Sequence, residues 1–281
     1  MLTYKTVRST FHPAYPLPNI RPVENREPAA VATRRPQASS LTFAVSMGLP
    51  SMEPDVWRKD VRRAKDKIGP GQLLIVSVIG TAPEGGDAEA LIADYARCAQ
   101  WAAEAGADAI EVHLAAPNPF EGRAQMIYES VPLSAQVLHR IRTTVAVPIV
   151  AKLGAFRNAR LLHETATKLA PWVDGFALVH GIHRRVVDKQ GQAAFDGGGR
   201  DLADVVGADT YPVASRQAEE MLSWRKAGAW DRAVLAGGGI TTVDRAHHVL
   251  TEGADAALVA TAALFDPLFA TRFRQARASA A

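Results

Sequence analysis

The stretch QLLIVSVIG, residues 72–80, decides the fold class. It is short, apolar and rich in β-branched residues, and it ends in glycine, which is typical of a strand buried on both faces. Asp87 can then cap a helix that extends to about Glu104, and Gly106 can terminate that helix. A buried strand followed by a helix is the unit from which parallel sheets are built.

The same alternation continues to the C-terminus. Further buried strands are predicted at 108–115, 147–154, 173–181, 232–240 and 256–264. Helices are predicted near 55–67, 132–143, 158–169, 213–228, 242–253 and 266–280, with Pro267 in the first turn of the last one. These repeated units favour a (β/α)₈ TIM barrel over an open sheet. LTYKTV (2–7) fits a seventh strand, so one barrel strand is missing from the count.

The domain organisation is predicted to be simple. Residues 1–281 are expected to form one barrel domain, in which 1–50 hold a strand and a long loop and 51–281 hold the barrel body. Residues 10–40 are rich in proline and are expected to be that loop rather than a separate domain. A polar, glycine-rich loop is expected after residue 181.

Composition excludes several classes of protein. No apolar run approaches the roughly 18 residues that a membrane span needs, and the first residues lack a secretory signal. The single cysteine, Cys98, cannot form an internal disulfide and is expected to be a packing residue in a cytoplasmic protein. Residues 1–40 carry six Lys or Arg and two Glu, so with +3 overall, residues 41–281 carry −1. Nucleic-acid binding is therefore not expected.

The ends of the predicted strands indicate where an active site lies. In TIM barrels the active site is built at the carboxyl ends of the strands, often with phosphate at the seventh and eighth loops. AGGGI (236–240) and ATAAL (260–264) occupy those two places. Gly238 and Gly239 are therefore candidates for phosphate binding, although a tight turn is the alternative.

Lys152 lies inside the apolar strand VPIVAKLG, where an ammonium group is costly unless it meets an anion. It is expected to contact a ligand or to act as a Schiff-base nucleophile, unless it only extends to the rim of the barrel. Lys5 has a similar setting.

His113 and His180 lie near the ends of two strands. Each is a candidate for an acid or base, and the alternative is a hydrogen-bonded histidine of the core. No metal-ligand spacing joins them, and Asn118 can be a turn residue.

Six ordered motifs together resemble the class 1 branch of the dihydroorotate dehydrogenase family, which are FMN-dependent barrels. They are YKT (4–6), SMGLPSMEPDVW (46–57), HLAAPN (113–118), VPIVAKL (147–153), GGGI (237–240) and GADAALVATAAL (253–264). SMGLP and AKL are the most specific of these matches. The family's first strand and helix would precede residue 1, so the resemblance implies a barrel that lacks the first β/α unit.

The resemblance implies a bound FMN cofactor. Lys152 would face the N1/O2 edge of the flavin, and Lys5 and Thr6 would lie beside the ring. Gly207, Gly238, Gly239 and Thr261 would hold the phosphate or the backbone near it. Leu49 would lie near the substrate. Family members are often dimers, which implies a homodimer.

The chain departs from the family on the substrate side. Ala116 stands where the family has the cysteine that removes a proton from the substrate, and an alanine cannot accept a proton. Ser51, His113 and His180 stand where the family has asparagines, and only Asn118 is kept. A site that exchanges several hydrogen-bonding groups normally loses its old ligand.

The leading hypothesis is an FMN-dependent oxidoreductase that exchanges hydride between flavin N5 and a small substrate other than dihydroorotate. His113 or His180 would be the acid or base. Three alternatives remain: a catalytically inactive flavoprotein or partner subunit, a flavin-free barrel enzyme that uses Lys152 on a phosphorylated substrate, and a dihydroorotate dehydrogenase of pyrimidine metabolism whose base lies outside the usual loop. The sequence has no cysteine cluster for an iron–sulfur centre, so such electron transfer would need a partner subunit.

Overall fold

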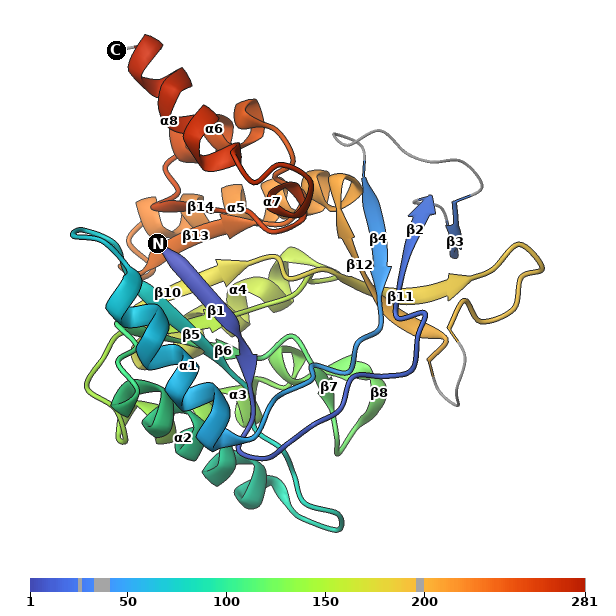
Figure 1. Cartoon of the computed structure of the whole chain (residues 1–281), viewed down its shortest axis with the longest axis vertical. Coiled ribbons are helices and arrows are strands. Elements are labelled where there is room, and N and C mark those ends of the chain that lie inside the picture. Colours follow the sequence, from blue (N-terminus) through green and yellow to red (C-terminus); the bar gives the residue numbers. More distant parts are fainter. Residues whose placement is uncertain (25–26, 33–40, 196–199, 281) are drawn as a thin grey trace.

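Seven parallel strands form the central sheet of the protein, in the order β1-β5-β6-β9-β10-β13-β14 (Figure 1). The computed structural model describes residues 1–24, 27–32, 41–195 and 200–280. The strands are β1 (Leu2–Val7), β5 (Leu74–Val78), β6 (Ala109–His113), β9 (Ile149–Lys152), β10 (Gly175–Leu178), β13 (Ala233–Gly237) and β14 (Ala256–Leu258). All pairs between neighbours in this sheet are parallel, which confirms the predicted α/β class.

Helices connect these strands and cover the sheet (Figure 1). They are α1 (Pro54–Lys67), α2 (Ala88–Glu104), α3 (Val131–Arg142), α4 (Ala159–Leu169), α5 (Tyr211–Lys226), α6 (Val243–Thr251), α7 (Thr261–Phe265) and α8 (Phe269–Ala280). Short 3₁₀ turns lie at Ile127–Glu129, Ala170–Trp172 and Ala208–Thr210, and a small ribbon is formed by β7 (Pro117–Asn118) and β8 (Gly122–Met126).

Local sequence explains where the second helix begins and ends. The Asp87 side chain accepts a hydrogen bond from the Ala90 N–H, as expected for a helix cap. Gly106 follows the helix with a φ of 103°, a conformation that favours glycine and turns the chain into β6. Cys98 on this helix is fully buried, which confirms its expected packing role.

The sheet buries both of its faces, as the apolar strands require. A large core lies between the sheet and the helices. A second, smaller cluster joins side chains of four strands, namely Ile75, Val150, Ala177 and Leu235. Alternate residues of the same strands therefore pack on opposite faces, which is the arrangement of a curled barrel wall. Within the described residues β1 and β14 each pair with one neighbour, so closure into a full (β/α)₈ barrel stays a prediction.

Five further strands form a small closed barrel that the sequence did not predict. They are β2 (Ile20–Glu24), β3 (Ala29–Val31), β4 (Thr42–Val45), β11 (Ile182–Val187) and β12 (Leu202–Gly207). The expectation of one long loop over 10–40 was therefore wrong at β2 and β3; residues 25–26 and 33–40 lie outside the described part. The loop expected after residue 181 was wrong at β11 and β12. In Figure 1 this small barrel lies on the side toward which the parallel strands point their carboxyl ends.

Two predicted elements near the C-terminus have different bounds. The strand expected over 256–264 ends at Leu258, and the alanine-rich run from Thr261 forms a short helix instead. The last helix begins at Phe269, so Pro267 precedes it. The Asp266 side chain accepts a hydrogen bond from the Leu268 N–H, which forms a turn around this proline and delays the helix.

Candidate active site

The predicted site residues meet at the carboxyl edge of the parallel sheet. His113 is the last residue of β6 and pairs in register with Lys152, the last residue of β9. His180 follows β10 by two residues, and its backbone N–H donates to Leu153 O. Three polar side chains from neighbouring strands therefore lie at one edge, as expected for a barrel mouth.

Lys152 is paired with a buried carboxylate. Its Nζ lies 3.0 Å from Oε1 of Glu111, and the two side chains are 22% and 4% exposed. An ammonium that is held in an ion pair cannot act as a nucleophile. The geometry therefore fits a fixed cation at the mouth better than a Schiff-base lysine.

His113 and His180 are in direct contact. Their ring centroids are 4.7 Å apart and the rings are nearly perpendicular. His113 is 1% exposed, and neither of its ring nitrogens has a hydrogen-bond partner. Burial, with help from His180 and Lys152, holds the pKa of His113 well below its usual range. His113 is therefore a neutral imidazole, whereas the His180 side chain is 24% exposed.

Asp204 on β12 bridges two histidines. Its Oδ2 lies 3.4 Å from Nε2 of His180, and its Oδ1 lies 2.9 Å from Nδ1 of His183. Burial alone would raise the pKa of Asp204, but the hydrogen bonds and charges of the two histidines outweigh it and lower this pKa well below its ordinary value. Asp204 is therefore a carboxylate. No group of His, Cys, Asp and Glu in the described part of the chain is arranged to hold a metal ion.

The small barrel brings Asp204 to this place. His183 on β11 is the direct antiparallel partner of Asp204 on β12. Gly181 connects His180 to β11, and a Cβ atom there would lie 2.9 Å from Cγ1 of Val206 and 3.1 Å from O of Val205. Only a residue without a side chain lets the connection pass this close to β12, so glycine is needed for His180 to reach Asp204.

Lys5 and Thr6 lie near the end of β1, at the same edge. Lys5 Nζ donates to the carbonyl oxygens of Thr6 and Pro50, at 2.9 and 2.5 Å. An ammonium has three N–H groups, so one is left for a ligand. Partial burial and then the nearby Arg8 lower the pKa of Lys5. The Thr6 hydroxyl lies 3.0 Å from that of Ser77 on β5.

The loop over 46–51 is held by Arg8. The Arg8 side chain is buried and donates to Leu49 O at 3.0 Å, to Thr81 Oγ1 at 2.9 Å and to Gly80 O. Leu49 has a φ of 52°, which is rare for a residue with a side chain. Ser51 Oγ accepts from the Arg8 backbone N–H and donates to Met52 O. Both hydrogen bonds of the Ser51 hydroxyl are made to backbone groups of the protein, so Ser51 is a weaker candidate for substrate binding.

The loop after β6 carries no reactive side chain. Ala115 and Ala116 are buried in the core, and Asn118 is 2% exposed. The Asn118 Oδ1 accepts from the Phe120 N–H at 3.1 Å, which is a turn within the same loop. The methyl groups of Ala115 and Ala116 thus pack in the core. The side-chain amide of Asn118 stabilises the turn of the same loop.

The predicted phosphate-binding glycines lie together beside the N-terminus of α5. Gly239 has a φ of 71°, and a Cβ atom there would lie 2.5 Å from Tyr211 N and 2.8 Å from Gly207 O. Gly238 would meet the Ala214 side chain at 2.8 Å. Thr261 is the first residue of α7, which begins three positions after the end of β14. Gly207, Gly238 and Gly239 therefore allow a close approach between two loops, one after β12 and one after β13.

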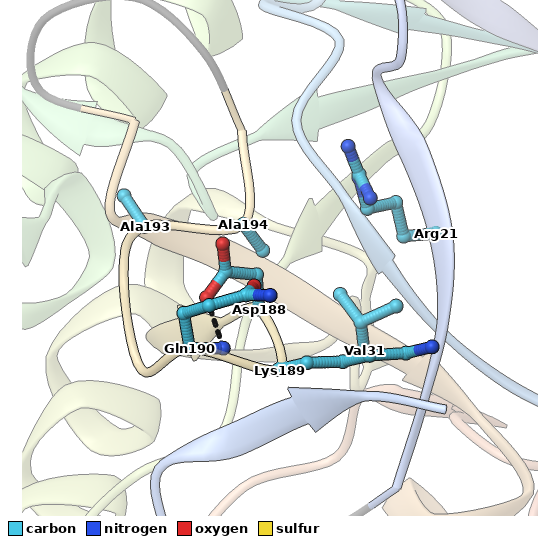
Figure 2. A pocket seen from close by; sticks show the side chains of 7 residues that line it. All are labelled: Arg21, Val31, Asp188, Lys189, Gln190, Ala193 and Ala194. Atoms are coloured by element: carbon cyan, nitrogen blue, oxygen red, sulfur yellow. Dashed lines mark hydrogen bonds between the residues drawn. The ribbon is translucent and has the colours of Figure 1, made fainter. Parts of the chain in front are cut away.

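A cavity of about 210 Å³ lies elsewhere, in the small barrel (Figure 2). It is lined by Arg21, Val31, Asp188, Lys189, Gln190, Ala193 and Ala194. None of the residues predicted from the sequence lines it. The Asp188 carboxylate accepts hydrogen bonds from the backbone of its own turn, at Gln190 and Gln192.

Four residues at or near the mouth were not identified from the sequence: Arg8, Glu111, His183 and Asp204. A carboxylate in an otherwise apolar strand was a usable signal for Glu111, because such a charge needs a partner. The alternation in LADVVG (202–207) was a weak strand signal that could have placed Asp204. His183 and Arg8 had no comparable signal.

The residues at the mouth fit a flavin mononucleotide in kind. Two lysines supply positive charge, the glycine turns approach a helix N-terminus, and His113 has buried ring nitrogens without partners.

The described helices include none that is long and apolar enough to cross a membrane.

Comparison with known proteins supports the resemblance to dihydroorotate dehydrogenases that the sequence motifs indicate. No family model matches the chain. The chain is 26% identical to dihydroorotate dehydrogenase of Dictyostelium discoideum over 289 positions, which cover 96% of this chain and 77% of that protein. The likeness thus extends over nearly the whole chain. This chain is therefore similar, at low identity, to a dihydroorotate dehydrogenase, which supports the resemblance seen in its sequence.

Proposed function

We propose that this chain is an FMN-dependent oxidoreductase that acts on a CH–CH group of a small substrate other than dihydroorotate. The observation that carries the proposal is the convergence of Lys152, His180 and Asp204 at the carboxyl edge of the sheet. This edge holds a fixed cation and an acid–base group, in a relative of a flavin-linked dehydrogenase family.

Seven residues would hold the cofactor: Lys5, Thr6, Lys152, Gly207, Gly238, Gly239 and Thr261. When bound, FMN supplies a two-electron acceptor whose N5 takes hydride from the substrate. Lys152 would stabilise negative charge at the far side of the ring, and its pairing with Glu111 fixes the ammonium in place. The glycine loops would approach the phosphate.

The acid–base role falls to His113 or His180. His113 is almost fully buried and neutral, so a substrate can reach it only if neighbouring side chains move. His180 is partly exposed and has a carboxylate partner. These observations favour His180 as the group that moves the proton and His113 as the ring that packs behind it.

The substrate is expected to differ from dihydroorotate because the residues on that side have changed. Ala116 offers no base, while Ser51 and Asn118 already bond within their own loops. Leu49, Ser51 and Asn118 remain the proposed substrate-side residues. A dihydroorotate dehydrogenase with its base outside the usual loop is the second candidate, because His180 beside Asp204 supplies such a base.

The first experiment is the visible absorption spectrum of the purified protein, alone and after addition of FMN. We expect flavin bands and release of FMN on heating. The Lys152→Met variant should bind FMN more weakly, whereas Lys189→Met, in the small-barrel cavity, should not differ from wild type. A colourless protein that ignores added FMN would overturn the proposal. Turnover of dihydroorotate with fumarate or a quinone would instead favour the second candidate.

A further inference from the structure

The mouth contains a carboxylate that neither the resemblance nor the alanine loop accounts for. Asp204 is not on a strand of the parallel sheet but on β12 of the small barrel. It nevertheless lies against His180, which follows β10 of the parallel sheet. Two separate structural units therefore meet at one pair of side chains.

The geometry assigns Asp204 a specific effect on the His180 ring. An ionised carboxylate can only accept hydrogen bonds, so the ring nitrogen nearest to it, Nε2, must carry the hydrogen. In the neutral ring the other nitrogen, Nδ1, then holds the lone pair. A carboxylate in this place also stabilises the imidazolium that forms when the ring takes up a proton.

His183 holds this carboxylate from its other side. Its Nδ1 lies 2.9 Å from Oδ1 of Asp204, a shorter distance than the 3.4 Å to His180, and its Nε2 is buried without a partner. The side chain of His183 is 16% exposed, so it is less accessible than His180. Its position fits an anchor that fixes the carboxylate rather than a second base.

We propose that Asp204 is the positioning residue that makes His180 the base of this enzyme, with His183 as its anchor. This inference rests on the proposed function. Nδ1 of His180 would accept the proton that leaves one substrate carbon, and FMN, when bound, would supply the acceptor for the hydride that leaves the neighbouring carbon. The electron pair left by the proton would form a C=C bond between the two carbons. Asp204 stays ionised throughout and gains no proton.

The inference also explains why the cysteine of the family loop can be absent. Ala115 and Ala116 are buried and cannot accept a proton, so the base must come from another strand. The small barrel supplies the carboxylate, and Gly181 allows the two units to approach. The proton-accepting group thus moves from the loop after β6 to the loop after β10.

The test is to read the tautomer of His180 directly. Long-range ¹H–¹⁵N spectra of protein labelled at histidine distinguish an Nε2–H ring from an Nδ1–H ring, and the His180→Asn variant identifies the resonances of His180. We expect the Nε2–H form in the wild type. In Asp204→Asn the amide can donate to the ring, so the Nε2–H form should become the minor one. Asp201→Asn, a change at the exposed residue immediately before β12, should leave the spectrum unchanged.

Two further variants protect the test against a folding defect. Asp204→Glu keeps the carboxylate and should retain most of the Nε2–H form. Gly181→Ala keeps every polar group but adds a methyl group against β12, and it should shift His180 toward the Nδ1–H form. An unchanged His180 tautomer in folded Asp204→Asn and Gly181→Ala would overturn the inference and leave Asp204 a merely structural role.

The outcome is separable from that of the proposed function because the spectra need neither flavin nor substrate. A tautomer change in a protein that binds no FMN would support the pairing of Asp204 with His180 but refute the flavin chemistry. An FMN-binding protein without the tautomer change would refute only the role of Asp204.

Discussion

Nζ of Lys152 lies 3.0 Å from Oε1 of Glu111, and the Glu111 side chain is almost completely buried. The two residues sit on adjacent strands, β9 and β6, so the pair joins the middle of the sheet. Removal of one partner of a buried pair leaves an uncompensated charge, whereas removal of both does not.

We therefore expect Lys152→Met to lower the free energy of unfolding by about 3–5 kcal/mol. The double variant Lys152→Met/Glu111→Gln should recover most of this loss, since the remaining groups are uncharged. Urea denaturation of the wild type, both single variants and the double variant gives the coupling energy. Single effects that simply add would contradict the pairing.

His113 predicts how stability depends on pH. Its pKa is held well below the ordinary value by burial and then by His180 and Lys152, while Asp204 acts in the opposite direction. Below about pH 6.5 the unfolded chain binds a proton that the folded state does not, so stability falls as the pH falls. From pH 7 to 5.5 the loss from this residue should be about 1 kcal/mol.

The matched variant is His113→Leu, which removes the titrating group. Its free energy of unfolding should change less over the same pH range, as measured by urea denaturation at pH 7 and 5.5. Asp204 does not contribute to the pH dependence between pH 7 and 5.5. Because its pKa is lowered in the folded state, the protein loses the stability that comes from this carboxylate only in more acidic solution. Equal pH dependence in both proteins would contradict the lowered pKa, because it would mean that His113 binds its proton equally well in the folded and unfolded states.

Gly239 and Gly228 provide a pair of glycines that separates backbone strain from crowding. Both have positive φ values, 71° and 82°, but an added Cβ meets Tyr211 N at 2.5 Å only at Gly239. Gly228→Ala should cost about 1 kcal/mol from backbone strain alone. Gly239→Ala should cost about 1–3 kcal/mol more, because the two loops must separate.

Thermal unfolding of the two alanine variants compares these costs. The Gly239→Ala variant should also bind FMN more weakly under the proposed function, whereas Gly228→Ala should match the wild type. Similar unfolding temperatures for the two variants would mean that the loop after β13 moves freely away from α5.

Cys98 is predicted to be unreactive. It is fully buried on α2, and burial and then the nearby Asp94 raise the pKa of its thiol well above the usual range. An aromatic disulfide reagent should label it only after denaturant is added. Cys98→Ala should keep FMN binding and cost about 1 kcal/mol of stability. Rapid labelling of the native protein would contradict the packing of this helix.

Much of the main sheet could be predicted from the sequence because its strands are buried on both faces. The run 2–7 was placed with the bounds that β1 has, and the Asp87 cap and Gly106 stop were both confirmed. These features depend on residues close together in the chain. Local patterns were therefore sufficient for them.

The small barrel was missed because its strands are short and their pairing is distant. β3 has three residues and β4 has four, and β4 pairs with β12 across more than 150 residues of sequence. The pairing of Lys152 with Glu111 and of His180 with Asp204 was missed for a related reason. Their contacts arise from the sheet register and from β12, which the sequence pattern does not reveal.

The wide sequence separation within the small barrel also has a consequence for the order of folding. Thr42 on β4 pairs with Gly207 on β12, so β4 emerges from a ribosome long before its partner exists. At about 5–20 residues per second the wait is roughly 8–30 s. During that time Val23 and Ala44, which end up in the core of the small barrel, have no strand β11 or β12 to cover them. The parallel sheet can begin to assemble from its own successive strands meanwhile, whereas the core of the small barrel is covered only after β12 has been made and has paired with β4.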